Sequence, residues 1–265
     1  METTKKTNRN QIAEISKTSQ SATTKAELIS KPALINSSIS ESLIIYLVVT
    51  IALLVCSKIR IINETGLATA TILLWVPAIL ILIHRTNTEI CGISRPLFKN
   101  MAYGIIVTIP FLFIYSLYIF SIKIDGGSFS HWFNKLFIFT RKSYGLLFYQ
   151  FIIETAAVSI PEEFFFRGYI QGTFSRYFQM KQNKDWKKKN EVNKEWPKNF
   201  LIPIISSALL FAILHVIVSF DPARIIVFFP ALLFGWFRYK TNDISASVIC
   251  HSLCNIFHYI CTGLT

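Results

Sequence analysis

Residues 199–220 read NFLIPIISSALLFAILHVIVSF, a run without a single Asp, Glu, Lys or Arg. An α-helix needs about 20 predominantly apolar residues to cross the hydrocarbon core of a bilayer. Three other uncharged runs of similar character are 42–57, 65–83 and 101–122. The stretch therefore predicts one membrane-spanning helix among several.

The composition of the whole chain points the same way. Of its 265 residues, 52% are hydrophobic and 16% are charged, whereas soluble domains carry about 25% charged residues. Further apolar stretches at 143–161, 225–237 and 244–263 bring the expected number of spans to about seven, within a range of six to eight. Spans must be helical because lipid offers backbone polar groups no hydrogen-bond partner. We therefore predict an all-α, polytopic transmembrane helix bundle over residues 42–265.

The first 41 residues differ from the rest. They are polar, rich in Ser, Thr and Lys, and poor in aromatic residues, which is typical of a disordered tail. No apolar core follows the early lysines until residue 42, so this segment is not expected to be a signal peptide.

The net charge of +12 raises the question of a nucleic-acid partner. Lys and Arg instead gather in alternate loops: with seven spans, 20 of the 27 fall on the side of the N-terminus. Cytoplasmic loops of membrane proteins carry such an excess. We therefore expect a cytosolic N-terminus, a lipid bilayer rather than a nucleic acid as the partner of this charge, and chemistry on the cytosolic side.

Polar residues within apolar helices are candidates for function because placing them there is costly. The first group lies in SIPEEFFFRGYI, residues 159–170. Glu163 and Arg167 are four apart on a helix and can pair. Glu162 is rotated by about 100° from Glu163 and stays free for chemistry. The alternative is an interfacial charge cluster at the end of a span.

Two further polar groups lie on later helices. In FAILHV, Phe211 and His215 share one face, and in HSLCN, His251 and Asn255 do the same. Each pair alone is also compatible with hydrogen bonds that hold membrane helices together. Brought together, a carboxylate and imidazoles form a general base for water, and an amide N–H can donate to a developing oxyanion. The set therefore suits water attack on an amide bond.

The order EExxxR, FxxxH and HxxxN resembles the CPBP family, which comprises type II CAAX prenyl endopeptidases and bacterial Abi membrane proteins. The flanking RGYIQG and LLFGWFRYKTNDISASVICH also resemble the family. The similarity covers residues 144–260, which is the expected catalytic core. It implies an intramembrane endopeptidase that acts on a peptide or a membrane protein. The candidate site residues are Glu162, Glu163, Arg167, His215, His251 and Asn255.

The resemblance implies a role for each of these residues. Glu162 would activate water with help from His215, while Glu163 and Arg167 would set the electrostatics of the site. His251 and Asn255 would stabilise the oxyanion. No cofactor is expected, although two His and two Glu could hold zinc in principle, and the zincin motif HExxH is absent from the sequence.

Two alternatives of other classes remain open. One is a non-catalytic Abi-type protein, such as a bacteriocin immunity factor or a scaffold, that retains the motifs as structure. The other is a transporter with an intramembrane proton or ion site. The sequence does not identify the substrate, its prenylation or the oligomeric state.

Overall fold

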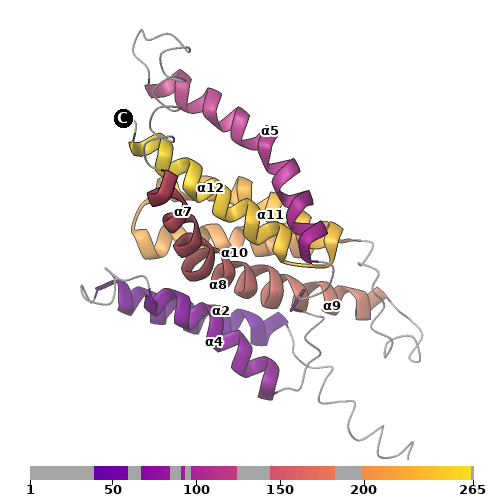
Figure 1. The fold of residues 1–265 in the computed structure, drawn as a ribbon. Coiled ribbons are helices and arrows are strands. Elements are labelled where there is room, and N and C mark those ends of the chain that lie inside the picture. Colours follow the sequence, from indigo (N-terminus) through magenta and orange to yellow (C-terminus); the bar gives the residue numbers. More distant parts are fainter. Residues whose placement is uncertain are drawn as a thin grey trace, which may run out of the picture.

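The computed structural model describes residues 39–58, 67–83, 91–92, 97–123, 144–182 and 199–263. Every extended regular element in these ranges is helical, which confirms the prediction of an all-α fold. The described residues form seven continuous helical segments (Figure 1). Residues 1–38 of the expected tail and residues 183–198 lie outside the described residues.

The segments follow one another without strands. They are α2 (Ile39–Lys58), α4 (Leu67–Ile83), α5 (Leu97–Lys123), the long helix 144–182, α10 (Leu201–Ser219), α11 (Phe228–Thr241) and α12 (Ser245–Gly263). The long helix comprises α7 (Tyr144–Ile153), η2 (Glu154–Ser159), α8 (Ile160–Glu163), η3 (Phe164–Ile170) and α9 (Gln171–Gln182). A short 3-10 turn, η5 (Pro222–Val227), precedes α11.

Several helices have the length and composition to cross a membrane. Among the described residues, these are Ile39–Lys58, Leu97–Leu117 and Leu201–Ser219, and a shorter apolar helix covers Ala68–Ile83. Large apolar side chains such as Ile44, Leu82 and Phe113 are more than half exposed. Such a surface fits lipid rather than water, so the chain is an integral, multi-pass membrane protein.

The long helix 144–182 is the centre of the bundle. The pair α2 and α4 packs on one side of it and α10 to α12 on another, while α5 packs against α12 (Figure 1). Every residue from 161 to 175 is buried, whereas α7 has no buried residue. The sequence placed the carboxylates at the end of a span over 143–161. The structure instead places them where the buried stretch begins, because Glu163 is paired with Arg167 inside the protein.

Candidate active site

The long helix is not a regular α-helix around the two glutamates. The N–H of Ile160 bonds to the carbonyl of Thr155, and the N–H of Gln171 bonds to that of Phe166, each five residues back. These π-turns flank the single α-helical turn that carries Glu162 and Glu163. A π-turn changes the direction in which later side chains point, and such turns are frequent at functional sites.

Arg167 and Glu163 form an ion pair inside the bundle. The Nη1–Oε1 distance is 3.1 Å, and both side chains are fully buried. Nη2 of Arg167 also donates to the carbonyl of Ala231 at 3.0 Å. The guanidinium lies over the rings of Phe211 and Phe234, at 4.6 and 5.1 Å from their centroids. A buried charge is costly unless it is paired and hydrogen-bonded, so this arginine ties the long helix to α11.

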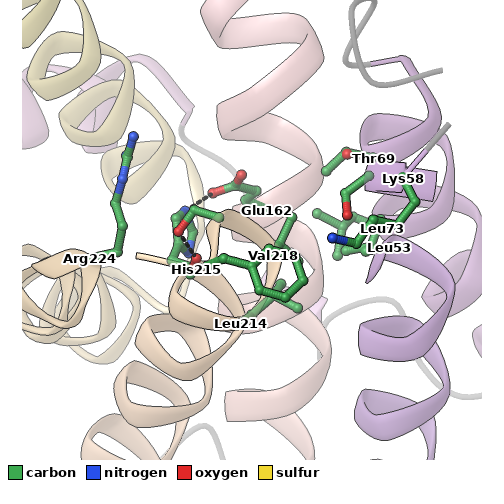
Figure 2. Close-up of a pocket in the computed structure, with 12 residues that line it drawn as sticks. Leu53, Lys58, Thr69, Leu73, Glu162, Leu214, His215, Val218 and Arg224 are labelled. Carbon is green, nitrogen blue, oxygen red and sulfur yellow. Dashed lines mark hydrogen bonds and ion pairs between the residues drawn. The ribbon is translucent and has the colours of Figure 1, made fainter. Parts of the chain in front are cut away.

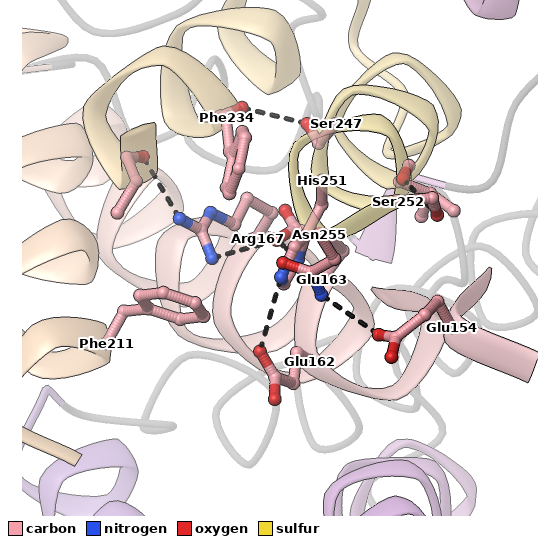
Figure 3. A network of polar contacts seen from close by, with 12 residues as sticks. Glu154, Glu162, Glu163, Arg167, Phe211, Phe234, Ser247, His251, Ser252 and Asn255 are labelled. Atoms are coloured by element: carbon pink, nitrogen blue, oxygen red, sulfur yellow. Dashed lines mark hydrogen bonds and ion pairs between the residues drawn. The ribbon is translucent and has the colours of Figure 1, made fainter. Parts of the chain in front are cut away.

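The same carboxylate oxygen of Glu163 also contacts His251 on α12. Nδ1 of His251 lies 3.0 Å from Oε1 of Glu163 (Figure 3). Because a carboxylate only accepts, this contact places the proton on Nδ1. Nε2 of His251 then faces Oε2 of Glu162 at 3.8 Å. Phe234 stacks on the imidazole with centroids 5.0 Å apart, which fixes the plane of the ring.

His215 approaches Glu162 from α10 in the same manner. Its Nδ1 lies 2.9 Å from the carbonyl of Phe211, one turn earlier. A carbonyl also only accepts, so Nδ1 carries the proton and Nε2 is left free. This Nε2 lies 3.9 Å from Oε2 of Glu162. Two imidazoles from two helices thus present Nε2 to one carboxylate oxygen, at distances beyond a direct hydrogen bond.

Asn255 lies one turn after His251 on α12, and both side chains line one cavity. Its Nδ2 donates to Oε2 of Glu154 at 3.1 Å. Oε1 of Glu154 accepts from Nε2 of Gln150, also at 3.1 Å. Glu154 was overlooked in the sequence, although a single acidic residue within the apolar stretch 143–161 was the signal that could have found it.

Two cavities meet at Glu162. The first, of about 490 Å³, extends to Leu53 and Lys58 of α2 and to α4 (Figure 2). The second, of about 380 Å³, extends to Glu154, His251 and Asn255. Both are lined by Glu162, His215 and Arg224. The carboxylate with its two imidazoles therefore lies where an elongated molecule could pass from one cavity into the other.

The first cavity is at one end of the bundle, where α2 and α10 finish and α4 begins. Lys58 lines it, whereas Ile39 is at the opposite end of the same 20-residue helix, about 30 Å away at 1.5 Å per residue. If α2 crosses the membrane, the N-terminus and this cavity lie on opposite sides. On that condition, this end of the first cavity would lie on the side of the membrane opposite a cytosolic N-terminus.

A bound metal ion such as zinc needs several ligands that converge on one point. Among the described residues, no group of three or more His, Cys, Asp or Glu side chains is placed to hold one. All five cysteines are free thiols. The residues brought together are thus a carboxylate, two imidazoles, an amide and a buried arginine pair.

Comparison with known proteins and protein families gives a match to one family model. No curated protein and no solved structure matches the chain. A family model described as "Type II CAAX prenyl endopeptidase Rce1-like" matches residues 144–257. The matched segment begins at the first residue of α7, ends within α12 and contains all six candidate site residues. Residues 144–257 therefore match the Rce1-like domain of the type II CAAX prenyl endopeptidase (CPBP) family.

Proposed function

We propose that the protein is an intramembrane endopeptidase in which Glu162 activates water for attack on a peptide bond. The observation that carries the proposal is the approach of two Nε2 atoms to one oxygen of Glu162, at 3.9 and 3.8 Å, where two cavities meet. A gap of this size suits a group held between the three atoms rather than a direct hydrogen bond. We assign this position to a water molecule, which is the nucleophile.

The chemistry then follows from the positions of the acceptors. Glu162 takes a proton from water while the water oxygen bonds to the carbonyl carbon of the substrate. The carbonyl electron pair moves to its oxygen, and the amide of Asn255 donates to that oxyanion. When the tetrahedral intermediate collapses, the C–N bond breaks, and the proton held by Glu162 passes to the leaving nitrogen.

Glu163 and Arg167 have supporting roles in this scheme. The carboxylate of Glu163 holds Nδ1–H of His251 at 3.0 Å and thereby keeps Nε2 directed at Glu162. Arg167 holds that carboxylate in turn, at 3.1 Å. A third group that fixes the tautomer and orientation of a catalytic histidine is a recurring arrangement in hydrolases. We assign Glu163 and Arg167 to that task.

The substrate we propose is a peptide or the chain of a membrane protein, which is what the CAAX endopeptidase family implies. An extended segment would enter through one cavity, pass Glu162 and His215, and continue into the other. We further propose that all seven helical segments cross or line the bilayer. With the N-terminus cytosolic, as the Lys and Arg distribution favours, the cavity beside Lys58 opens at the opposite face.

The test is isotope incorporation with purified protein. Wild type, Glu162→Gln and the remote control Glu41→Gln would be reconstituted with membrane extract in H2¹⁸O. Wild type and the control should release peptides with one ¹⁸O in each new carboxyl group, and Glu162→Gln should release none. A scaffold or a transporter would produce no labelled carboxyl groups in any of the three, and that result would refute the peptidase.

A further inference from the structure

We infer that Glu154 is a positioning residue for Asn255, holding the amide group of that side chain in one of its two possible orientations. The inference rests on the proposed function, because the orientation matters only if Asn255 donates to an oxyanion. Glu154 lines the same cavity as Glu162, His251 and Asn255.

The argument starts from the symmetry of the asparagine side chain. Its carbonyl oxygen and its NH2 group have nearly the same shape, so both orientations fit the same space. Only the NH2 group stabilises an oxyanion; the carbonyl oxygen would repel it. A residue in this position therefore needs a neighbour that selects one orientation.

Glu154 can make this selection because an ionised carboxylate only accepts hydrogen bonds. With Nδ2 of Asn255 3.1 Å from Oε2 of Glu154, rotation of the amide by 180° would bring two oxygens together. The NH2 group has two hydrogens. One is used by Glu154, and the second remains for the substrate oxygen.

The carboxylate of Glu154 is itself held from the other side. Nε2 of Gln150 donates to Oε1 at 3.1 Å, from one turn earlier on the long helix. Next to this contact, the hydroxyl of Thr155 donates to that of Ser252 at 3.0 Å. This second contact joins η2 to α12 and fixes the separation across which Glu154 reaches Asn255. The hydrogen-bonded series Gln150, Glu154 and Asn255 thus runs from α7, which has no buried residue, into the cavity.

The experiment compares turnover by Glu154→Gln, Glu154→Ala, Asn255→Ala and the double variant Glu154→Ala/Asn255→Ala. The substrate is a synthetic copy of the most abundant peptide sequence cleaved by wild-type membranes and not by Glu162→Gln membranes. Loss of an oxyanion donor lowers kcat by about 10²–10³-fold, so Asn255→Ala should fall in that range. Glu154→Ala should lower kcat about tenfold or more with KM unchanged, since the contact acts in the transition state.

The remaining variants separate orientation from other effects. Glutamine at position 154 can still accept from Asn255 but no longer forbids the reversed amide, so Glu154→Gln should lose part of kcat, to an extent between wild type and Glu154→Ala. The double variant should be no slower than Asn255→Ala, because one residue acts through the other. Thr155→Val removes the neighbouring hydroxyl contact without touching the amide, and its loss of kcat should be smaller than that of Glu154→Ala.

The following results would overturn the inference while leaving the peptidase intact. They are normal kcat in Glu154→Ala, additive losses in the double variant, or an equal loss in Thr155→Val, which would indicate helix docking instead. Equal loss of activity in Glu154→Gln and Glu154→Ala would assign Glu154 a charged role and would also overturn it. If the cleavage of no peptide depends on Glu162, the proposed peptidase function is refuted, and this inference is refuted with it.

Discussion

At the scale of single residues, the two adjacent glutamates have different surroundings. Glu163 is fully buried and contacts Arg167 and His251 through one oxygen. Within the part of the chain that the structure describes, Glu162 has no such direct partner and faces two imidazoles across a gap. One carboxylate therefore belongs to the framework of the site, and the other is available to a substrate.

This difference predicts opposite effects on stability. Glu163→Gln leaves Arg167 buried beside a neutral amide, and breaking a buried ion pair costs about 3–5 kcal/mol. Its melting temperature in detergent should fall clearly below that of wild type. Glu162→Gln breaks no ion pair with Arg167 and should melt within about 2 °C of wild type, since it removes at most a few tenths of a kcal/mol. Differential scanning fluorimetry measures both.

Activity provides the second half of this comparison. Both variants should lose cleavage, Glu162→Gln through the base and Glu163→Gln through the misdirected His251. Near-normal turnover in Glu162→Gln, together with a stable but inactive Glu163→Gln, would mean that the roles of the two glutamates are reversed.

At the scale of elements, the position of His251 depends on how closely α5 approaches α12. A Cβ added to Gly104 of α5 would lie 2.6 Å from the carbonyl oxygen of Ala246, the second residue of α12. Neither backbone can yield locally, so the helices would have to separate. His251 lies just over one turn further along α12 and would move with it.

Gly104→Ala should therefore lower the melting temperature and the turnover together, at a cost of about 1–3 kcal/mol for an overpacked contact. Gly145→Ala in α7 is the matched control, because no atom lies within 4 Å of the added Cβ. That control should be neutral or slightly stabilising, as alanine is the better helix former by about 1 kcal/mol. Equal melting temperatures for the two variants would contradict the close contact of α5 and α12.

Local spacing accounts for what the sequence could predict at this scale. The i,i+4 rule places Glu163 beside Arg167, and it places His251 and Asn255 on one face, because both depend only on helix geometry. The contact of Glu163 with His251 joins residues 88 positions apart and depends on how α12 docks. The π-turns of the long helix also have no simple signature in the residues.

Glu154 illustrates the other limit. It shares the cavity with Glu162 because the long helix continues past the site in both directions, whereas the sequence suggested that the span ended there. From the sequence alone, charged residues predict the edge of a membrane segment. Arg167 shows why this rule failed: the ion pair, the Ala231 carbonyl and two aromatic rings together satisfy the charge inside the bundle.

At the scale of the whole molecule, the orientation in the membrane determines which compartment supplies the substrate. The Lys and Arg distribution favours a cytosolic N-terminus, and Lys58 marks the cavity end of α2. We therefore predict that an impermeant thiol reagent labels Lys58→Cys in intact cells and does not label a cysteine introduced within residues 1–30. Permeabilised cells should label at both positions, which controls for access.

The reverse pattern would place the cavity in the cytosol and the N-terminus outside. Labelling of both positions in intact cells would mean that α2 does not cross the membrane. Either result would refute the orientation without affecting the chemistry assigned to Glu162.

The central claim is that Glu162 is the base of a peptidase, and the most direct measurement is mass spectrometry of peptides from membranes that contain either wild type or Glu162→Gln at equal abundance. We predict a set of new peptide termini that is present with wild type and with Glu41→Gln and is missing with Glu162→Gln. Identical sets of termini in wild type and Glu162→Gln, with both proteins folded and equally abundant, would contradict the account.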